Sequence, residues 1–342
     1  MAIKWTDFLK WFASLLVFFL LPRDVQSQAT KLETVRASFA SFGAIYYPHL
    51  LAKERGYYAE EGIDIEMILM PGGIATPALV AGNIHFSTSS RSALNAILRG
   101  HDLRVIYVTV DRPYYSVFTN KKEIRTAHDL KGKRFGIQSR ADSHHTAVSI
   151  WLKKNGLDPV RDVSWLVVGS TEARVATLLK DHVDAVTLAP SGAFAIKAQK
   201  ASVYEVVNLG REVKMLFTGL AVAKQLVNTR PDLVRRFLRA TMKGREFYKS
   251  FKDETLRLTK KYDRNPDDVR SYDYDVTLEV MTRDGTEDVE TQRLDIEVGS
   301  RNLGITVDVP VDRVFDFRFV REVYKEIRES NWQPTIPKAV LK

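Results

Sequence analysis

Apolar and polar positions alternate along this chain with two different periods. From Glu33 onward, stretches with apolar or β-branched residues at every second position are followed by stretches with apolar residues three or four positions apart. The first pattern is typical of strands and the second of amphipathic helices. In the first third of the chain it predicts strands over 33–39, 63–70, 85–87 and 104–110, and helices over 44–55, 74–81 and 90–99.

A second run of the same kind begins near Tyr115. It predicts strands over 117–119, 134–138, 163–168, 183–188 and 203–208, and helices over 143–154, 171–180 and 192–200. The next apolar segment, 215–222, returns towards the first run, and the remaining chain is mostly helical. There we expect one helix over 233–262 or two broken near Ser250, another over 267–281, a turn over 283–287 and a further helix within 310–329.

This alternation predicts an α/β fold in which helices cover both faces of parallel or mixed sheets. Because the chain crosses between the two runs near residues 112 and 217, we expect two α/β lobes joined by a two-strand hinge. Residues 30–112 and 218–342 would form lobe 1 with a helical C-terminal region, and residues 113–217 would form lobe 2. Ligands of open α/β sheets bind outside the carboxyl ends of the strands. The lobes would therefore face each other across one ligand-binding cleft, which closes by hinge motion.

Residues 1–29 have the pattern of a secretory signal peptide. Lys4 and Lys10 precede an apolar run, 11–21, that fits a signal-peptide core and is short for a bilayer span. The alternative is an uncleaved N-terminal anchor. In both cases we expect the folded part to be periplasmic.

The composition argues against several classes of function. The formal net charge is +9, but the basic residues are scattered without a long run, so we expect no nucleic-acid partner. The absence of cysteine excludes disulfides, thiolate zinc sites and a cysteine nucleophile. His144 and His145 are adjacent and project about 100° apart on a helix, so we expect no metal site. Without a nucleotide-binding or nucleophile motif, we expect no cofactor and no enzymatic activity.

Four segments carry a resemblance to a known family: PHLLAKERGYYAEEGIDIE (48–66), ALVAGNIHFSTSS (78–90), DLKGKRFGI (129–137) and LLKDHVDAVTLAP (178–190). They resemble solute-binding proteins that serve ABC importers for alkanesulfonates, taurine, nitrate and thiamine-pyrimidine precursors. The resemblance covers residues 33–190 and continues more weakly to about residue 260.

The resemblance implies a periplasmic-binding-protein-like fold and a small-molecule ligand. It also implies an ABC permease and ATPase in the inner membrane as partners. One position departs from the family pattern: His85 stands where such proteins usually have an aspartate, whereas Asp184 keeps the usual residue in the second unit. Since a fold does not decide a function, the site carries the functional argument.

The candidate ligand-binding residues lie in the loops after the predicted strands and in the crossing segment. Each of the four loops opens a helix, and helix N-termini bind anions through their free N–H groups. Arginines and serines favour an anion, whereas Asp111 and Asp142 would suit an amine instead. The candidates are Phe42, Gly43, Ser89, Ser90, Arg91, Asp111, Arg112, Tyr114, Arg140, Ser143, His144, Pro190 and Ser191. For Ser90 a simple helix cap is the alternative role.

We therefore expect the periplasmic solute-binding component of an ABC importer. It would capture a small anionic organic molecule, such as a sulfonate or carboxylate, in the cleft between the lobes and deliver it to a permease. One alternative is an enzyme of the same fold that acts on a small organic acid. Another is a ligand-sensing partner of a membrane receptor.

Overall fold

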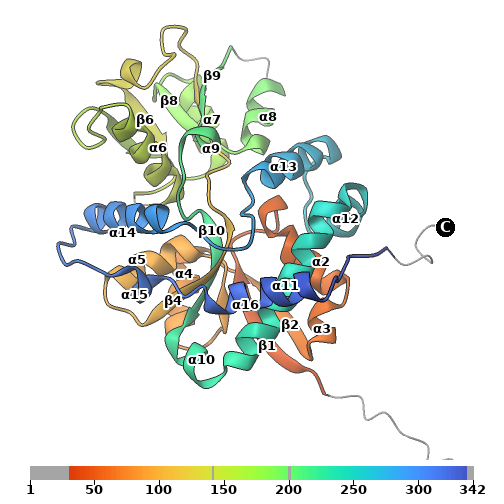
Figure 1. Cartoon of the computed structure of the whole chain (residues 1–342). Coiled ribbons are helices and arrows are strands. Elements are labelled where there is room, and N and C mark those ends of the chain that lie inside the picture. Colours follow the sequence, from red (N-terminus) through yellow and green to blue (C-terminus); the bar gives the residue numbers. More distant parts are fainter. Residues whose placement is uncertain (1–30, 141, 199–201, 337–342) are drawn as a thin grey trace, which may run out of the picture. The chain divides into compact units, whose positions relative to one another are not determined.

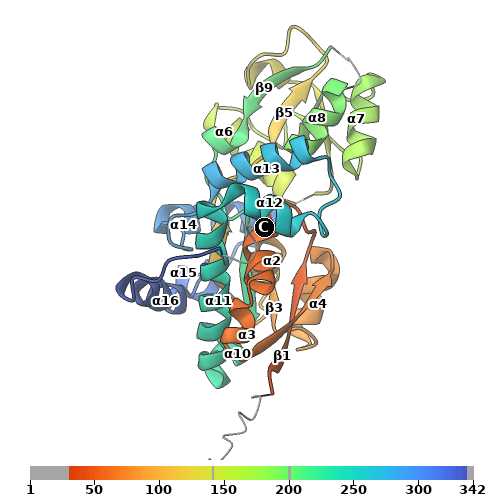
Figure 2. The same ribbon diagram turned by 90° about the vertical axis from the view of Figure 1, so that its right-hand side faces the viewer.

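The computed structural model describes residues 31–140, 142–198 and 202–336. The predicted signal peptide, residues 1–29, lies outside the described residues. From Glu33 the chain forms one compact unit that contains two five-stranded sheets (Figure 1, Figure 2). Both sheets are mixed and flanked by helices, so the predicted α/β fold class is confirmed.

The first sheet contains β1 (Glu33–Phe39), β2 (Ile63–Leu69), β3 (Phe86–Ser87), β4 (Leu103–Val110) and β10 (Thr218–Ala223). Their order is β2-β1-β3-β10-β4. β1 runs parallel to β2 and β3, and β10 runs antiparallel to β3 and β4. All eight residues of β4 are buried although it ends the sheet. The C-terminal segment covers this edge through bridges from Met281 and Phe315, which protects an otherwise open strand.

The second sheet contains β5 (Ser116–Thr119), β6 (Arg134–Ile137), β7 (Ser164–Val167), β8 (Ala185–Leu188) and β9 (Tyr204–Asn208). Their order is β7-β6-β8-β5-β9. β6 is parallel to β7 and β8, and β5 is antiparallel to β8 and β9. The carboxyl ends of β6 and β8 therefore lie at the same edge of this sheet.

All six predicted helices that alternate with the strands are present, and the described residues contain three further short ones that were not predicted. Those of the first sheet are η2 (Ala44–Tyr46), α2 (Tyr47–Glu54), α3 (Tyr57–Glu60), α4 (Gly72–Val80) and α5 (Ser90–Leu98). Those of the second sheet are η3 (His128–Leu130), α6 (Ser143–Lys154), α7 (Thr171–Leu179), α8 (Pro190–Ala198) and α9 (Leu209–Glu212). Gly56 follows α2 with a φ of 75°, the left-handed conformation that ends helices at glycine.

The C-terminal region is helical, as predicted, and its described residues contain two helices that the sequence pattern did not reveal. Its helices are α10 (Lys224–Thr229), α11 (Pro231–Ser250), α12 (Lys252–Thr259), α13 (Asp267–Val280), α14 (Val289–Leu303), α15 (Val311–Val314) and α16 (Arg318–Glu329). The predicted break near Ser250 separates α11 from α12. The unpredicted helices are α10 and α14, and α14 interrupts its apolar positions with charged residues and Gly299. Asp288 caps it by accepting a hydrogen bond from the Thr291 N–H at 2.8 Å.

Helix α11 packs closely against α2 because glycine occupies the contact. A Cβ atom at Gly244 would clash with the carbonyl oxygen of Pro48 and lie 2.8 Å from the backbone nitrogen of Ala52. This close approach fixes α2, and with it η2 and the loop after β1, against the C-terminal helices.

Two segments connect the sheets, as the predicted two-strand hinge requires. The first follows β4 and the second precedes β10, and they run side by side. The Met215 N–H donates to the carbonyl oxygen of Asp111 at 2.9 Å, and the Leu209 N–H donates to that of Tyr115 at 3.0 Å. The two α/β lobes therefore meet at a paired connection.

His85 and Asp184 occupy corresponding places in the two sheets. The Nδ1 atom of His85 accepts a hydrogen bond from the Arg36 N–H at 3.0 Å. In the second sheet, Oδ2 of Asp184 accepts one from the Arg134 N–H at 2.9 Å. Burial lowers the pKa of His85, which keeps the ring neutral and able to accept. The histidine thus replaces the usual aspartate in the same structural role.

Candidate functional site

A cavity of about 420 Å³ lies where loops from both lobes meet. Its walls come from the loop after β1, the crossing segment after β4, the start of α8, the connection between α12 and α13, and α13 itself. Helix α13 contacts both α8 of the second lobe and η2 of the first, and Figure 1 and Figure 2 show it below α8 and next to α12. The volume is within the usual range of small-molecule sites, about 300–1,000 Å³.

Aromatic side chains form part of this cavity's wall. Phe42 and Tyr262 meet edge to face with their ring centroids 5.8 Å apart. Tyr114, in the crossing segment, also lines the cavity and packs edge to face on Phe217 with the ring centroids 5.3 Å apart. Rings held in this way offer a rigid apolar surface to a planar or aliphatic ligand.

Two carboxylates line the same cavity. Asp263 is 7% exposed and accepts hydrogen bonds from the Tyr47 hydroxyl at 2.7 Å and from the Asn265 N–H at 3.0 Å. Asp273 is 8% exposed, and its Oδ1 atom is buried without a hydrogen-bond partner. Burial, with a smaller contribution from Asp263, raises the pKa of Asp273 to about 7. The cavity therefore contains a carboxyl group that the protein itself leaves unsatisfied.

Four of the sequence-predicted site residues line this cavity: Phe42, Gly43, Tyr114 and Ser191. They come from the first loop, the crossing segment and the fourth loop, so the structure brings together residues far apart in sequence. Pro190 lies beside it and, with Tyr114, lines a smaller cavity of about 180 Å³ next to β5 and β9. Their role in binding a ligand stays a prediction.

The second candidate loop, which follows β3, does not line this cavity, and its charge is neutralised inside the protein. Arg91 is buried and forms an ion pair with Asp295 of α14. The other Asp295 oxygen accepts from the Leu216 N–H at 2.5 Å. Burial beside Asp295 raises the pKa of Glu287, the neighbouring carboxyl group. Ser89 and Ser90 precede this arginine, and Ser90 is fully buried.

The crossing-segment charges are also turned towards each other. The Nε atom of Arg112 lies 3.9 Å from Oδ1 of Asp111. Burial raises the pKa of Asp111, and neither side chain lines the cavity between the lobes.

The third candidate anion site, at the start of α6, is used for internal packing. His144 stacks on Tyr115 with ring centroids 3.6 Å apart, and its Nδ1 atom lies 2.8 Å from the Thr187 hydroxyl. Burial lowers the pKa of His144 well below its usual value. The Ser143 hydroxyl lies 3.4 Å from that of Tyr115.

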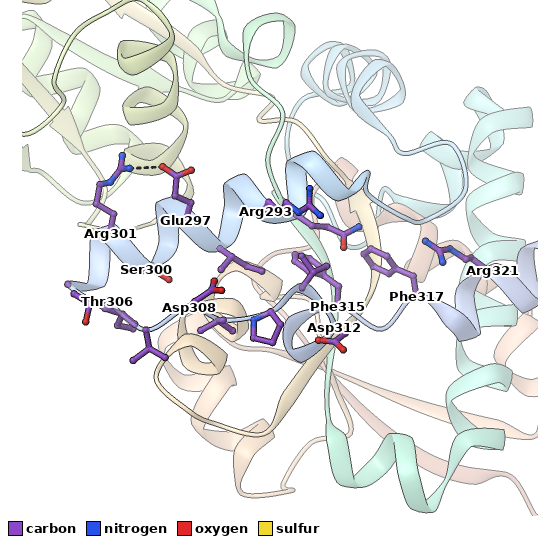
Figure 3. Close-up of a pocket in the computed structure, with 18 residues that line it drawn as sticks. Arg293, Glu297, Ser300, Arg301, Thr306, Asp308, Asp312, Phe315, Phe317 and Arg321 are labelled. Carbon is purple, nitrogen blue, oxygen red and sulfur yellow. Dashed lines mark hydrogen bonds and ion pairs between the residues drawn. The ribbon is translucent and has the colours of Figure 1, made fainter.

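Two larger cavities lie outside the meeting point of the strand ends. Arg140 lines one of about 1200 Å³, between α6, the loop before β7 and the end of α14. The other, of about 1170 Å³, runs along α14 and the segment that follows it (Figure 3). There Arg301 pairs with Glu297, while Phe315 and Phe317 provide apolar surface (Figure 3). Neither cavity combines loops from both sheets.

The residues that sequence reasoning missed come from the C-terminal helices: Tyr262, Asp263, Arg264, Asn265, Asp273 and Thr277. The sequence points to the loops after strands and to the crossing segment, and nothing local links α13 to the loop after β1. One signal was present. Asp273 lies four positions after Val269 and four before Thr277, both buried, and an acidic residue on a buried helix face is unusual.

In residues 31–140, 142–198 and 202–336, no helix is long and apolar enough to cross a membrane. Within the same part of the chain, no three histidine, aspartate or glutamate side chains are grouped so that they could hold a metal ion.

Among curated proteins, the chain is similar to the riboflavin-binding protein RibY of Chloroflexus aurantiacus. The two are 26% identical over 207 residues, which cover 58% of this chain and 57% of RibY. The match thus spans less than two thirds of that relative's length.

Among solved structures, the periplasmic aliphatic sulphonate-binding protein SsuA from Escherichia coli matches with a TM-score of 0.69. It is 18% identical and covers 90% of this chain and 94% of its own. The desulfurization enzyme DSZB matches with a TM-score of 0.59 and 16% identity, over 86% of this chain and 99% of its own. At these identities the likeness shows the fold, that of periplasmic binding proteins.

The match to a protein family extends over more of the sequence than that to RibY. The profile of the family described as NMT1/THI5 like matches residues 45–254. This range includes both crossings between the lobes, but of the residues that line the cavity it includes only Ile45, Tyr114 and Ser191. Because the profile covers more than half of the chain, the chain belongs to the NMT1/THI5-like family.

Proposed function

We propose that the protein is the periplasmic solute-binding component of an ABC importer. It holds a small organic molecule in the cavity between its lobes and delivers it to a permease and ATPase in the inner membrane. The observation that carries this proposal is the cavity of about 420 Å³ lined by loops from both lobes. Family membership and the signal-peptide pattern of residues 1–29 support it.

Closure of the cavity follows from the paired connection between the lobes. The two crossing segments are the only covalent links that the described chain provides between the sheets. A small change of backbone angles in both would swing one lobe against the other. Closing would remove water from the ligand and strengthen its polar contacts, and the closed form would dock on the permease.

The sequence-based expectation of an anionic ligand has limited support in the structure. Arg91 and Arg112 face carboxylates of the chain itself, and Arg140 lines a different cavity. The cavity between the lobes is instead lined by Asp263 and Asp273. The charged residues that line this cavity therefore do not support a sulphonate, the ligand named for SsuA. Riboflavin, which is named for RibY, becomes one of the compounds to test.

An enzyme of the same fold is the second candidate, since DSZB shares the architecture. A cysteine nucleophile is excluded because the chain has no cysteine. Mass spectrometry of a bound compound released from the protein distinguishes the two: a binding protein returns it unchanged, whereas an enzyme returns a product.

A sensor would keep the cavity but associate with a membrane receptor in place of a permease. Co-purification from membranes in the presence of ligand distinguishes the sensor from the importer component. Recovery of a permease supports the importer, and recovery of a receptor without a permease contradicts it.

The test of the proposed function is thermal unfolding of the purified protein against a panel of compounds. The panel contains riboflavin, pyrimidines, amines, taurine, alkanesulfonates, aromatic carboxylates and nitrate. A ligand at a hundred times its Kd stabilises the folded state by about 2.7 kcal/mol, which raises Tm by about 5 °C in a chain of this size.

A matched pair of glycine variants locates the binding. Gly43 lines the cavity in an extended conformation that any residue can adopt, and a Cβ atom there meets nothing closer than 3.8 Å. Gly43→Leu should therefore fill the cavity and abolish the ligand-induced shift without unfolding the protein. Gly73→Leu, at an exposed site on α4 with open space around it, should retain the shift. An unchanged shift in Gly43→Leu would exclude this cavity as the site.

A further inference from the structure

Both crossing segments are held by one stretch of the C-terminal region, residues 281–295. At the first crossing, the Thr282 N–H donates to the carbonyl oxygen of Thr109 at 3.0 Å, at the end of β4. At the second crossing, the Leu216 N–H donates to Oδ2 of Asp295 at 2.5 Å. Movement of one lobe against the other changes the backbone angles of the crossing segments, so this stretch is placed to control the hinge.

The acceptor at the second crossing, Asp295, belongs to a buried cluster of charged groups. It is fully buried, and its other oxygen pairs with Arg91 of α5, the helix on which α14 packs (Figure 1). Glu287, which precedes α14, is 3% exposed, and its carboxyl group is within hydrogen-bonding reach of the carboxyl group of Asp295. Two buried carboxyl groups therefore lie together beside the hinge.

The contact between the two carboxyl groups requires a proton. An ionised carboxyl group only accepts hydrogen bonds, so two carboxylates cannot bond to each other. Within the described residues, neither oxygen of the Glu287 side chain receives a hydrogen bond from an N–H or another O–H donor. Burial, with the negative charges of Asp295 and Asp111, raises the pKa of Glu287 well above its ordinary 4.5, while Arg91 opposes this rise. The proton therefore belongs on Glu287.

The other charged groups around this cluster are paired with each other. In the first crossing segment, Nε of Arg112 lies 3.9 Å from Oδ1 of Asp111. In the second, Nζ of Lys214 lies 3.1 Å from Oδ2 of Asp288, the residue that caps α14. The arginine of α5 can neutralise one of the two buried carboxyl groups and not both. Loss of the proton would thus leave an uncompensated buried negative charge at the hinge.

We propose that the proton shared by Glu287 and Asp295 is a switch for the hinge. While the proton is present, Asp295 keeps its bond from the Leu216 N–H, and α14 holds the second crossing segment in a latched state. When the proton passes to water, the two carboxylates repel each other and require solvation, so the start of α14 moves off the crossing segment. In this released state the lobes are free to take other relative orientations.

The direction of the pH dependence follows from the position of the proton. Because the pKa of Glu287 is raised in the latched state, that state binds the proton more tightly than the released state. Lowering the pH therefore favours the latched state. Once the pH exceeds the pKa of the latched pair, the ratio of latched to released molecules falls by up to tenfold per pH unit.

Distances between spin labels on the two lobes test the proposal in the ligand-free protein. Because the chain contains no cysteine, Ala59→Cys and Ala176→Cys place single labels at exposed positions on α3 of lobe 1 and α7 of lobe 2. In pulsed electron paramagnetic resonance, the distance distribution should be narrow at pH 5 and broader at pH 9. Identical distributions at the two pH values would overturn the proposal.

Two substitutions at the start of α14 separate the switch from general effects of pH. Glutamine donates a hydrogen bond as protonated glutamate does, but it has no proton to lose. Glu287→Gln in the labelled chain should therefore keep the narrow distribution at both pH values. Glu290→Gln removes an exposed carboxylate three residues away and should broaden at pH 9 like its parent. Broadening of the Glu287→Gln chain at pH 9 would show that this pair does not hold the proton.

Hydrogen exchange of the Leu216 amide provides a second readout at the hinge itself. Its protection factor, corrected for the intrinsic exchange rate at each pH, should fall at least tenfold between pH 5 and pH 9 and stay constant in Glu287→Gln. A merely structural role of Glu287 would lower protection equally at every pH. If the variant does not fold, the unsubstituted chain decides alone, because constant protection of Leu216 refutes the proposal. Neither experiment uses a ligand, so their outcome is independent of the proposed solute-binding function.

Discussion

The buried carboxyl of Asp273 makes a quantitative prediction for the ligand-free protein. The perturbation is Asp273→Asn, which keeps nearly the same volume and removes the ionisable group. Because Asp273 is buried beside Asp263, ionising it in the folded state is unfavourable. The substitution should therefore stabilise the ligand-free protein.

The magnitude follows from the difference between the folded and unfolded pKa. Burial raises the pKa of Asp273 from an ordinary 3.8 to about 7. A raised carboxyl pKa means that the folded state binds the proton more tightly than the unfolded state, so stability falls as pH rises from about 4 to 7 and is constant above. Each pH unit of that interval corresponds to about 1.4 kcal/mol. The accumulated destabilisation is about 1.6 kcal/mol at pH 5 and about 4 kcal/mol at pH 8.

The assay is thermal unfolding without ligand at pH 5 and pH 8 for wild type, Asp273→Asn and Glu279→Gln, which removes an exposed carboxylate from the same helix. The stabilisation by Asp273→Asn should be larger at pH 8 than at pH 5 by about 2.5 kcal/mol, a difference in Tm of about 5 °C. Other groups titrate equally in all three proteins, so the comparison isolates Asp273. Equal Tm differences at the two pH values would show that Asp273 is not an unsatisfied buried acid.

Substitutions at three further positions test other contacts, each by urea denaturation. Gly244→Ala should lower the free energy of unfolding by about 3 kcal/mol, because the new Cβ meets the Pro48 backbone; unchanged stability would contradict the close packing of α11 on α2. His85→Ala should lower it by about 1 kcal/mol through loss of an acceptor, and His85→Asp should recover the loss if the two side chains are equivalent. Asp295→Ala should lower the free energy of unfolding by about 3–5 kcal/mol relative to wild type, since it leaves the buried Arg91 without its partner. A loss below about 1 kcal/mol would show that the pair is solvated.

The sequence predicted most of the fold because both lobes alternate short apolar strands with amphipathic helices. The break between α11 and α12 at Phe251 was also visible, as a change in the helical pattern near Ser250. Helix α14 was missed because Gly299 and its charged residues dilute the apolar periodicity. Tertiary contact explains that glycine: a Cβ there would press against Leu98 and Leu94 of α5.

The candidate site was predicted less completely, for a different physical reason. Phe42 and Ser191 could be proposed from the sequence because each lies just after the carboxyl end of a strand, β1 and β8 respectively. The pairing of Arg91 with Asp295 joins positions 204 residues apart, and no local pattern encodes it. The same is true of Asp273, whose position depends on how α13 packs between the lobes.

The exchange of histidine for aspartate at position 85 makes the two halves of the molecule respond differently to acid. Because the pKa of His85 is lowered, its contribution to the free energy of unfolding is complete above pH 6.5 and is lost as acid protonates the ring. The hydrogen bonds from Arg134 lower the pKa of Asp184. The contribution of Asp184 to the free energy of unfolding therefore persists to a pH below the usual range of carboxyl pKa values. Between these limits the contact between β1 and β3 in the first sheet weakens, while the contact between β6 and β8 in the second sheet holds. Amide hydrogen exchange at about pH 5 should then show the two sheets opening as separate cooperative units, with β1 and β3 exchanging before β6 and β8.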